Sequence, residues 1–536
     1  MAAPSSHVIP YLLPSLSSME EASEQLLSQA VSELCSCLGR SAITPRTPAG
    51  YAELSQAVVV WATPGPDPAS QETVPSRACA AASAFLRLLE AIKTTSRDNQ
   101  KARDSDTAGA GSAPIETPGD LLQDGKKELT SGKGHVSESP EDISFKHNKE
   151  PPSSASFGSP GAGSLDPHCI LAHVTSPLLL LCGAHIEEKP WTDLCSRSLA
   201  GQLLQTLLRM WDCKSVADLL KGPDSPEPEF VIFREVLGLL GPRLRKDTWE
   251  SHPDAKIVFS WMLYRVPRPW LTDFLSRVMP PSLLFSDDYK PENKVLGVRC
   301  LHHIINNVPA ADLRQYNRAM VVYHALRNHL YTTEAEVIEV VLPCLLDLFP
   351  VLHKPPPAVG SFQKDGENPS DQVMQLILTH MEMEHKIALR RLYARNLPAL
   401  QERLGARIVR HMKRLLRVIV GYLEMHDGPE ETARLCILET LQGTIKYAWP
   451  RIPPRLSLLV KALLKLIYEV STDPGQHSQP IREALLQRAT ECLILLDCCS
   501  KGQVKVSWQT THGIPTICKD PDMVKCISRV LKDELQ

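Results

Sequence analysis

The chain has 536 residues, of which 43% are hydrophobic and only 5% aromatic, and its formal net charge is −3. This length allows several domains or one elongated array. Cores filled by aliphatic side chains favour helices over β-sandwiches, and the small net charge gives no general attraction to nucleic acid or acidic membranes.

In the N-terminal part, residues 1–95, apolar periodicity predicts helices near 18–34, 51–61 and 76–95. This part is too small for a large core of its own, so we expect it to pack on later helices. Residues 96–167 are dominated by Gly, Ser, Pro and charged residues and predict a disordered linker. Within it, Ser139 has the acidic, exposed context of a phosphorylation site. It could equally be a linker residue without a function.

From residue 168 the helical patterns become dense, and no strand pattern is found. The predicted segments are a first part of helical repeats (168–353), a loop (354–370), a second part (371–503) and a divergent C-terminal tail (504–536). Helix, tight turn and helix recur at roughly forty residues, which is typical of HEAT or armadillo units. The predicted fold is therefore all-α: an irregular HEAT/armadillo-like α-solenoid of antiparallel helix pairs, with a long disordered linker.

The stretch 286–317 illustrates the unit. Asp287 and Asp288 offer capping oxygens, Pro291 suits the first helical position, and Glu292 suits the positive end of the helix dipole. Apolar residues at three- and four-residue steps predict one buried face, and Val308-Pro309 ends the helix. A second amphipathic segment follows at once, so we expect these two helices to form an αα-hairpin.

The fifteen cysteines lie mostly on apolar helix faces, and no CxxC pair occurs. Unpaired thiols of this kind predict a reducing compartment, and we expect the cytoplasm and nucleus. The N-terminus lacks the basic flank and long apolar core of a signal peptide. We also expect no apolar run long enough to span a bilayer.

No catalytic motif is recognisable. The pairs His302-His303 and His324/His329 lack the spacing and intervening glutamate of zinc proteases, and the run from His380 to His385 resembles a helix end. There is no GxSxG, no glycine-rich dinucleotide loop and no kinase signature set. We therefore predict no catalytic residue, no metal site and no cofactor.

The strongest polar signal is basic. Arginines step by three or four along a helix predicted over 404–423, and three more precede them: Arg403, Arg407, Arg410, Arg414 and Arg417, with Arg390, Arg391 and Arg395. We call this set the basic ridge. It could bind a carboxylate- or phosphate-bearing partner, or it could be a solvated face partly paired with acids on adjacent helices.

Two further groups are polar beyond what a helix start needs. They comprise Asp287, Asp288, Tyr289 and Asn293, and then Tyr316, Asn317 and Arg318. Asn396 adds a polar position beside the ridge. These residues are either turn and cap chemistry or a recognition surface at the edges of the repeats, and with the basic ridge they are our candidates for partner binding.

At these residues the chain resembles the family of the second Tel-two-interacting proteins, which form the smallest subunit of the TTT complex. The strings that carry the likeness are Ser286–Tyr289, Glu292–Lys294, Gly297–Ile304, Asn307–Leu313, Leu378–Glu382, Tyr393–Ala399, Asp427–Glu431 and Cys492–Asp497. The likeness runs from about residue 242 to 502, and residues 507–536 show no family feature.

The resemblance implies a helical-repeat scaffold without enzymatic activity. It implies direct binding to the larger Tel-two-interacting subunit and, through it, to the Tel-two subunit. It also implies work with the ninety-kilodalton heat-shock chaperone and its RuvB-like ATPase co-chaperone. The clients would be the phosphatidylinositol-3-kinase-related kinases: mTOR, ATM, ATR, the DNA-dependent kinase, the nonsense-decay kinase and the TRRAP pseudokinase.

From the residues alone, two other functions stay open. One is a helical-repeat adaptor of another kind, such as a transport receptor or a nucleic-acid-associated scaffold. The other is an enzyme whose site is not visible in the sequence, because catalytic groups can assemble from distant positions.

Overall fold

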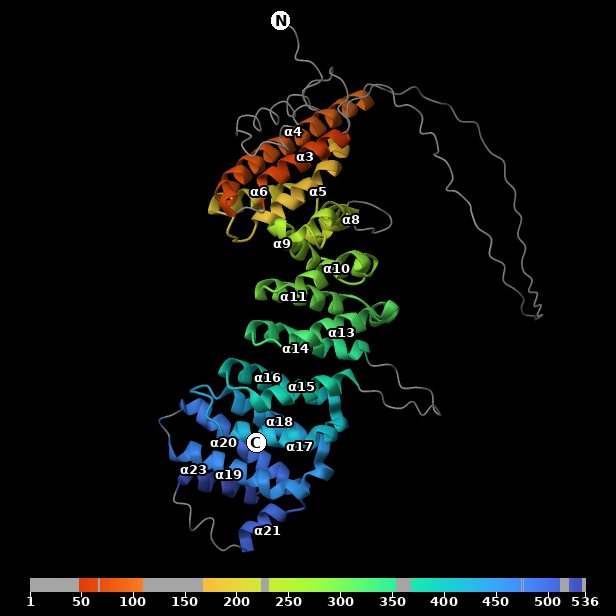
Figure 1. The fold of residues 1–536 in the computed structure, drawn as a ribbon. Helices are drawn as coiled ribbons and strands as arrows, with labels where there is room; N and C mark the ends of the chain where they lie inside the picture. Colours follow the sequence, from red (N-terminus) through yellow and green to blue (C-terminus); the bar gives the residue numbers. More distant parts are fainter. Residues whose placement is uncertain are drawn as a thin grey trace, which may run out of the picture. The chain divides into compact units, whose positions relative to one another are not determined.

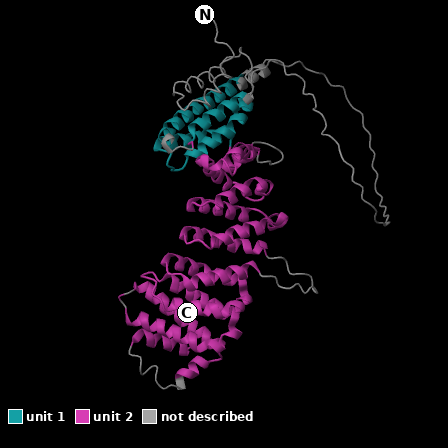
Figure 2. Cartoon of the chain, in the orientation of Figure 1, with its two compact units in different colours: residues 1–63, 69–212 teal, residues 64–68, 213–536 magenta. Residues whose placement is uncertain are grey.

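The structure is a computed structural model that describes residues 48–65, 68–108, 167–222, 231–352, 368–473, 475, 477–510 and 520–532. The chain forms two compact units: unit 1 (residues 1–63 and 69–212) and unit 2 (residues 64–68 and 213–536), coloured separately in Figure 2. Within the described ranges every regular element is a helix. The predictions for 18–34, for Ser139 and for most of 354–370 lie outside the described residues.

Unit 1 packs four long helices against one another. Its elements are α3 (Pro48–Ala62), η1 (Pro68–Thr73), α4 (Val74–Ala108), α5 (Pro167–His185) and α6 (Leu194–Met210). Helix α3 lies against α5, and α4 lies against α5 and α6, so the N-terminal helices do pack on later ones, as expected. The predicted segmentation placed α5 and α6 with the repeats that follow, whereas in the structure they share a unit with α3 and α4.

Helix α4 continues to Ala108, so the predicted start of the linker at residue 96 is wrong. Its last turns are polar, but they contain Arg, Lys, Gln and Ala, which are good helix formers. Adding residues to an existing helix costs no new nucleation, and the earlier part of α4 is anchored by buried apolar residues. A polar composition therefore did not end the helix here.

Helix α5 is long and apolar enough to cross a membrane by length and composition alone, contrary to our expectation that no such run exists. Most of that helix is buried inside unit 1, where it packs on α3, α4 and α6. The same length and composition are found in the core helix of a globular unit. In the structure α5 is the central helix of unit 1.

Unit 2 is a succession of helices (Figure 1). Its first elements are α7 (Val216–Lys221), α8 (Val231–Leu240), η2 (Gly241–Leu244), η3 (Trp249–Ser251), α9 (Pro253–Leu263), η4 (Trp270–Phe274), α10 (Leu275–Ser286), α11 (Pro291–Asn307), α12 (Ala310–Arg314), η5 (Gln315–Asn317), α13 (Arg318–His329) and α14 (Ala335–Leu352). They continue with α15 (Pro369–Met383), α16 (Ile387–Leu404), η6 (Gly405–His411), α17 (Met412–Leu423), α18 (Thr432–Ala448), η7 (Trp449–Arg451), η8 (Pro453–Arg455), α19 (Leu456–Thr472), α20 (Gln479–Cys499), α21 (Gln503–Thr510) and α23 (Pro521–Lys532).

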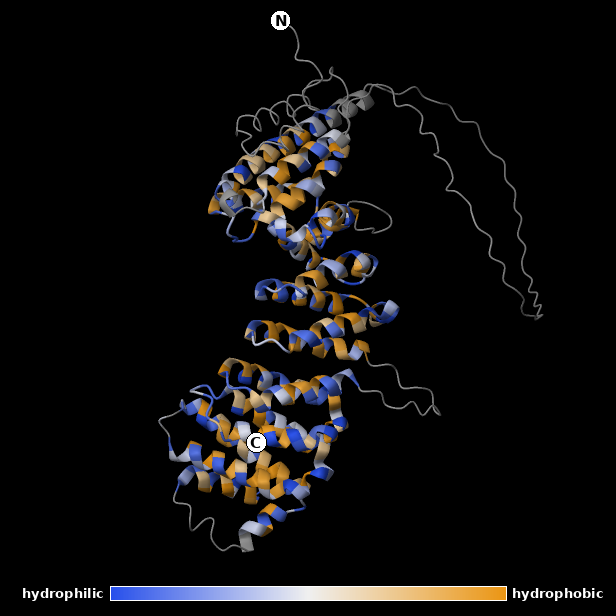
Figure 3. Cartoon of the chain, viewed as in Figure 1, coloured by the Kyte–Doolittle hydropathy of each residue, from blue (hydrophilic) through white to orange (hydrophobic). Residues whose placement is uncertain are grey.

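These helices form antiparallel pairs stacked in two layers. Tight turns join α10 to α11, α13 to α14, α15 to α16, α17 to α18 and α19 to α20. The second helices of the pairs contact one another in the order α11, α14, α16, α18 and α20, and the first helices form the other layer. Apolar and polar stretches alternate along single helices (Figure 3), as expected when one face is buried between neighbours. Unit 2 is thus an α-solenoid, which confirms the predicted fold class.

The pairing around α11 differs from the prediction. Helix α11 forms its hairpin with α10, which precedes it, and the chain after Val308 leads to the next pair. Pro291 stands at the first helical position and Glu292 in the first turn, as predicted, but no side chain caps this helix. Gly297 of α11 lies so close to α10 that a Cβ atom there would be 2.2 Å from the backbone nitrogen of Ser286. The absence of a side chain at Gly297 allows the two helices this contact.

Candidate partner-binding surface

The tight turns of the pairs lie on the same side of the stack, the left side in Figure 1, and we call this side the turn edge. It comprises residues 287–290, 330–334, 384–386, 424–431, 473, 475, 477 and 478, with the helix residue on either side of each turn. The other connections, including 308–317 and 449–455, lie at the opposite ends of the helices. A helix of seventeen residues separates the two edges by about 25 Å.

The first turn shows which predicted residues are structural and which are exposed. Asp288 and Asn293 are buried, and the Asn293 side-chain amide donates a 2.6 Å hydrogen bond to the Asp288 carboxylate. The Lys256 ammonium of α9 donates a 2.6 Å hydrogen bond to Oδ1 of the Asn293 side chain. Asp287 is exposed, and Tyr289 is 72% exposed with Lys290 beside its ring. Of this group, Asp287 and Tyr289 are available to a partner.

Polar contacts join the first turn to the second. Ser286 Oγ lies 2.7 Å from His329 Nε2, and Lys294 lies 3.7 Å from the Glu334 carboxylate. Burial and then the positive charge of Lys294 lower the pKa of His329, so its neutral form is favoured. The ring of Tyr331 in turn meets His380 of α15 edge-on, with centroids 6.1 Å apart. These two turns are therefore each tied to the following pair.

Two arginines of the predicted basic ridge, on α16, join their helix pair to the α17–α18 pair. We call such a polar contact between the turns of neighbouring pairs a joint. Arg390 is buried, with its guanidinium 4.0 Å from the centre of the Tyr422 ring. Arg391 donates to both carboxylate oxygens of Asp427, at 3.3 and 3.2 Å, and to its backbone carbonyl. The same carboxylate accepts a 2.7 Å bond from the Ala433 amide at the start of α18. Both arginines therefore make contacts with residues of the same chain, which makes them poor candidates for binding a partner.

Two histidines and a glutamate meet between the last two turns. Glu431 is fully buried, and its Oε1 lies 2.9 Å from His477 Nε2 and 3.5 Å from His426 Nε2. The two imidazole rings stack with centroids 5.3 Å apart. Arg434, also buried, approaches the same oxygen at 3.5 Å. The sequence analysis did not single out this cluster, because His477 is 46 residues from Glu431 in the chain.

This cluster has ligand atoms within 4.8 Å of one another, as a metal site would. Two contacts argue against that interpretation. The Gly428 amide donates to His426 Nδ1 at 2.8 Å, so the neutral ring carries its proton on Nε2, the atom that faces Glu431. Arg434 already supplies positive charge to the carboxylate. We therefore interpret the cluster as an ionic hydrogen-bonded joint between the α17–α18 and α19–α20 turns.

Several large apolar side chains at the turn edge are exposed. The exposed fractions are 72% for Tyr289, 58% for Tyr331, 73% for Met383, 56% for Ile387 and 48% for Met425. Aromatic residues and Met are enriched where proteins bind one another. The turn edge is the best candidate for partner binding.

The predicted helix over 404–423 is broken, which splits the basic ridge. Helix α16 ends at Leu404, residues Gly405–His411 form η6, and α17 starts at Met412. Gly405 has φ +52°, a conformation that glycine adopts readily and that interrupts an α-helix. Arg403 and Arg407 are exposed but do not lie on α17 with Arg414. Arg395 is exposed on α16, and Asn396 donates to the Leu392 carbonyl of its own helix.

The rest of the ridge faces acids of α15. Arg414 binds both oxygens of Glu382, at 2.7 and 3.3 Å, and this hydrogen bonding lowers the pKa of Glu382. Arg417 lies 3.6 Å from the same carboxylate, and Arg410 lies 3.4 Å from Asp371. Arg410 and Arg417 are nevertheless 53% and 64% exposed. The ridge is partly neutralised, which fits the solvated-face alternative better than an anion site.

The second polar group lies away from the turn edge. Tyr316 and Asn317 have φ +52° and +59°, so these two residues have non-helical backbone between α12 and α13. Tyr316 is 78% exposed, and the Arg318 guanidinium lies 5.1 Å from the centre of its ring. These residues belong to the connection between α12 and α13, at the opposite ends of the helices from Tyr289. The structure does not bring the two polar groups together.

Comparison with known proteins identifies relatives. The Tti2 family model matches residues 238–429. The human protein named TELO2-interacting protein 2 is 53% identical over 363 residues, covering 67% of this chain and 70% of that protein. The mouse protein of the same name is 51% identical over 360 residues, covering 67% and 69%.

Among solved structures, yeast importin-beta (Kap95p) aligns with a TM-score of 0.44 at 12% identity, over 100% of this chain and 61% of that one. That structural likeness is loose. The sequence identity to the human and mouse proteins is high and covers two thirds of their length, and the chain belongs to the Tti2 family.

Proposed function

We propose that this protein is the smallest subunit of the TTT co-chaperone complex and acts as a non-enzymatic scaffold in the cytoplasm and nucleus. It binds the larger Tel-two-interacting subunit directly and the Tel-two subunit through it. With the ninety-kilodalton heat-shock chaperone, the complex stabilises phosphatidylinositol-3-kinase-related kinases such as mTOR, ATM and ATR. The observation that carries the proposal is the 53% identity to the human protein named TELO2-interacting protein 2.

The turn edge is the surface we assign to the direct partner. An α-solenoid exposes long edges on which another helical-repeat chain can lie. On this edge the buried polar joints hold the turns in place, while the outward Tyr and Met side chains supply apolar area. Turns whose backbone is already ordered lose less conformational entropy on binding than a loose loop, so this order favours affinity.

Affinity capture from cell extract, with mass spectrometry of the retained proteins, tests the proposal. The turn-edge variant is Met383→Asp/Ile387→Asp, on the α15–α16 turn. Its matched control is Trp449→Asp/Leu458→Asp, two residues that are 57% and 45% exposed in and just after the α18–α19 connection. A third variant, Arg410→Glu/Arg414→Glu, tests the basic ridge, and circular dichroism checks that each variant folds.

We expect wild type, the control and the ridge variant to retain the two TTT partners and the kinases, and the turn-edge variant to lose them. Loss only in the ridge variant would move the interface to the ridge and leave the function in place. If folded wild type retains neither partner, the TTT assignment is wrong, and a helical-repeat adaptor of another kind becomes the better hypothesis.

A further inference from the structure

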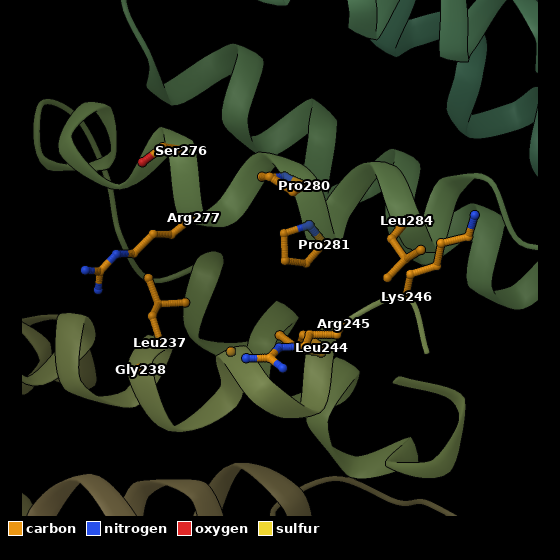
Figure 4. Close-up of a pocket in the computed structure, with 11 residues that line it drawn as sticks. Leu237, Gly238, Leu244, Arg245, Lys246, Ser276, Arg277, Pro280, Pro281 and Leu284 are labelled. Atoms are coloured by element: carbon orange, nitrogen blue, oxygen red, sulfur yellow. The ribbon is translucent and has the colours of Figure 1, made fainter. Parts of the chain in front are cut away.

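A groove of about 620 Å³ lies in unit 2 between α8 with η2 on one side and α10 on the other (Figure 4). Its apolar lining comes from both sides: Leu237, Leu244, Pro280, Pro281 and Leu284. Gly238 and Gly241 also line it, and a Cβ atom at either would meet no heavy atom within 4 Å. The groove is open there, and its volume is in the range of pockets that hold a small ligand or a few side chains.

All of the charged residues that line this groove are positive. Arg277 lies at one end, Lys246 at the other, and Arg245 between them (Figure 4). None of the eleven lining residues is acidic. In the part of the chain that the structure describes, no ion pair joins these three cations to a carboxylate, and Arg277 donates to the backbone carbonyl of Arg234. Exposed, unneutralised cations beside apolar surface attract carboxylates.

Two prolines of α10, Pro280 and Pro281, line the groove. Pro280 and Pro281 lack the amide that would bond to the carbonyls of Ser276 and Arg277, four residues earlier. Both residues with these carbonyls line the groove. The two carbonyls thus lose their usual helical partners, while the groove itself combines apolar contacts with cations, which suits a polypeptide better than a simple anion.

We propose that this groove binds a short acidic and apolar segment of a partner chain. The apolar side chains of that segment lie against Leu237, Leu244 and Pro281, and its carboxylates face Arg245, Lys246 and Arg277. This goes beyond the proposed function, because the groove is a different surface from the turn edge and a second docking site there does not depend on it. All of the lining residues except Leu237 fall within residues 238–429, the part matched by the Tti2 family model.

Fluorescence anisotropy on the purified full chain tests the proposal with three labelled synthetic helical peptides. The first combines leucine on one face with glutamate elsewhere. The second replaces glutamate by lysine, and the third replaces leucine by serine. The first should bind, with affinity that falls as salt rises, and the other two should bind at least about tenfold more weakly.

Two variants with different mechanisms test the location. Arg245→Glu/Lys246→Glu reverses the charge, and Gly238→Leu fills the groove without an immediate backbone clash. Each should weaken binding of the first peptide about tenfold or more. The matched controls are Arg451→Glu/Lys461→Glu, exposed cations elsewhere in unit 2, and Gly201→Leu, another helical glycine with open space.

Circular dichroism confirms that each variant folds, and both controls should bind like wild type. The proposal is overturned if the Leu/Glu peptide does not bind. It is also overturned if the Leu/Lys or Ser/Glu peptide binds as tightly, or if both groove variants keep wild-type affinity. Equal loss in variants and controls would show charge-driven adhesion with no defined site and would overturn it too.

Discussion

Replacing Gly297 by alanine should destabilise unit 2, although alanine is the better helix former. The added Cβ would lie 2.2 Å from the Ser286 nitrogen, 2.6 Å from its Cα and 2.8 Å from the Phe285 carbonyl carbon, all backbone atoms. Because backbone cannot rotate aside, α10 and α11 must separate, and their buried side chains lose contact. Overpacking of this kind costs about 3 kcal/mol, and the gain in helix propensity is about 1 kcal/mol, so the net loss is about 2 kcal/mol.

Urea denaturation of the full chain, followed by far-ultraviolet circular dichroism, measures this loss as a lower unfolding midpoint. Gly421→Ala in α17 is the matched control, because a Cβ there meets nothing within 4 Å. That change should raise the midpoint slightly or leave it unchanged. If Gly297→Ala is as stable as wild type, the close approach of α10 and α11 is not a constraint, and the packing argument is refuted.

Two other predictions concern single buried polar groups. Asp427→Ala removes both the acceptor of the Ala433 amide and the partner of Arg391, and should lower the free energy of unfolding by about 2 kcal/mol in the same denaturation assay. The control is Glu430→Ala, whose side chain is 70% exposed and whose loss should change that free energy by less than about 0.5 kcal/mol. Equal effects of the two substitutions would refute the role of the Asp427 joint. Burial lowers the pKa of His185 to about 4 in folded unit 1. As the pH falls below about 6.5, this histidine becomes protonated in the unfolded chain but stays neutral in folded unit 1. The free energy of unfolding of unit 1 should therefore fall by up to about 3 kcal/mol by pH 4. Hydrogen exchange of the α5 amides, corrected for intrinsic rates, should show this loss of stability in wild type and a smaller loss in His185→Gln. If the free energy of opening falls equally with pH in both proteins, His185 is not the group responsible.

Much of the fold could be predicted from local signals. Proline at the start of α11, the Asp427–Glu431 turn and the apolar periodicity of α17 to α20 each act within a few residues, and all appear in the structure. The pairing of α11 could not be predicted in the same way, because the segments on both sides of it are amphipathic. The break at Gly405 was also missed, since a glycine inside an apolar pattern is compatible with a continuing helix.

The surface was less predictable because its order depends on contacts between distant residues. The polar signal at Asp288 and Asn293 was correctly recognised, but burial makes these residues internal, and the same holds for Arg390. The exposed Met383 and Ile387 gave no signal, since an apolar residue beside a turn resembles a core residue in sequence. Only the stacking of successive pairs shows that these side chains share one edge with Tyr289 and Tyr331.

The polar joints along the turn edge also have a mechanical consequence. In unit 2 each helix pair contacts chiefly the pairs next to it, so the joints at Ser286, Arg391 and Glu431 lie in series and carry the same force when the ends are pulled apart. A spring assembled in this way yields first at its weakest link while the others hold. Unit 2 should therefore lengthen in steps under tension, and a rigid partner lying along the edge would stiffen it by bridging several links at once.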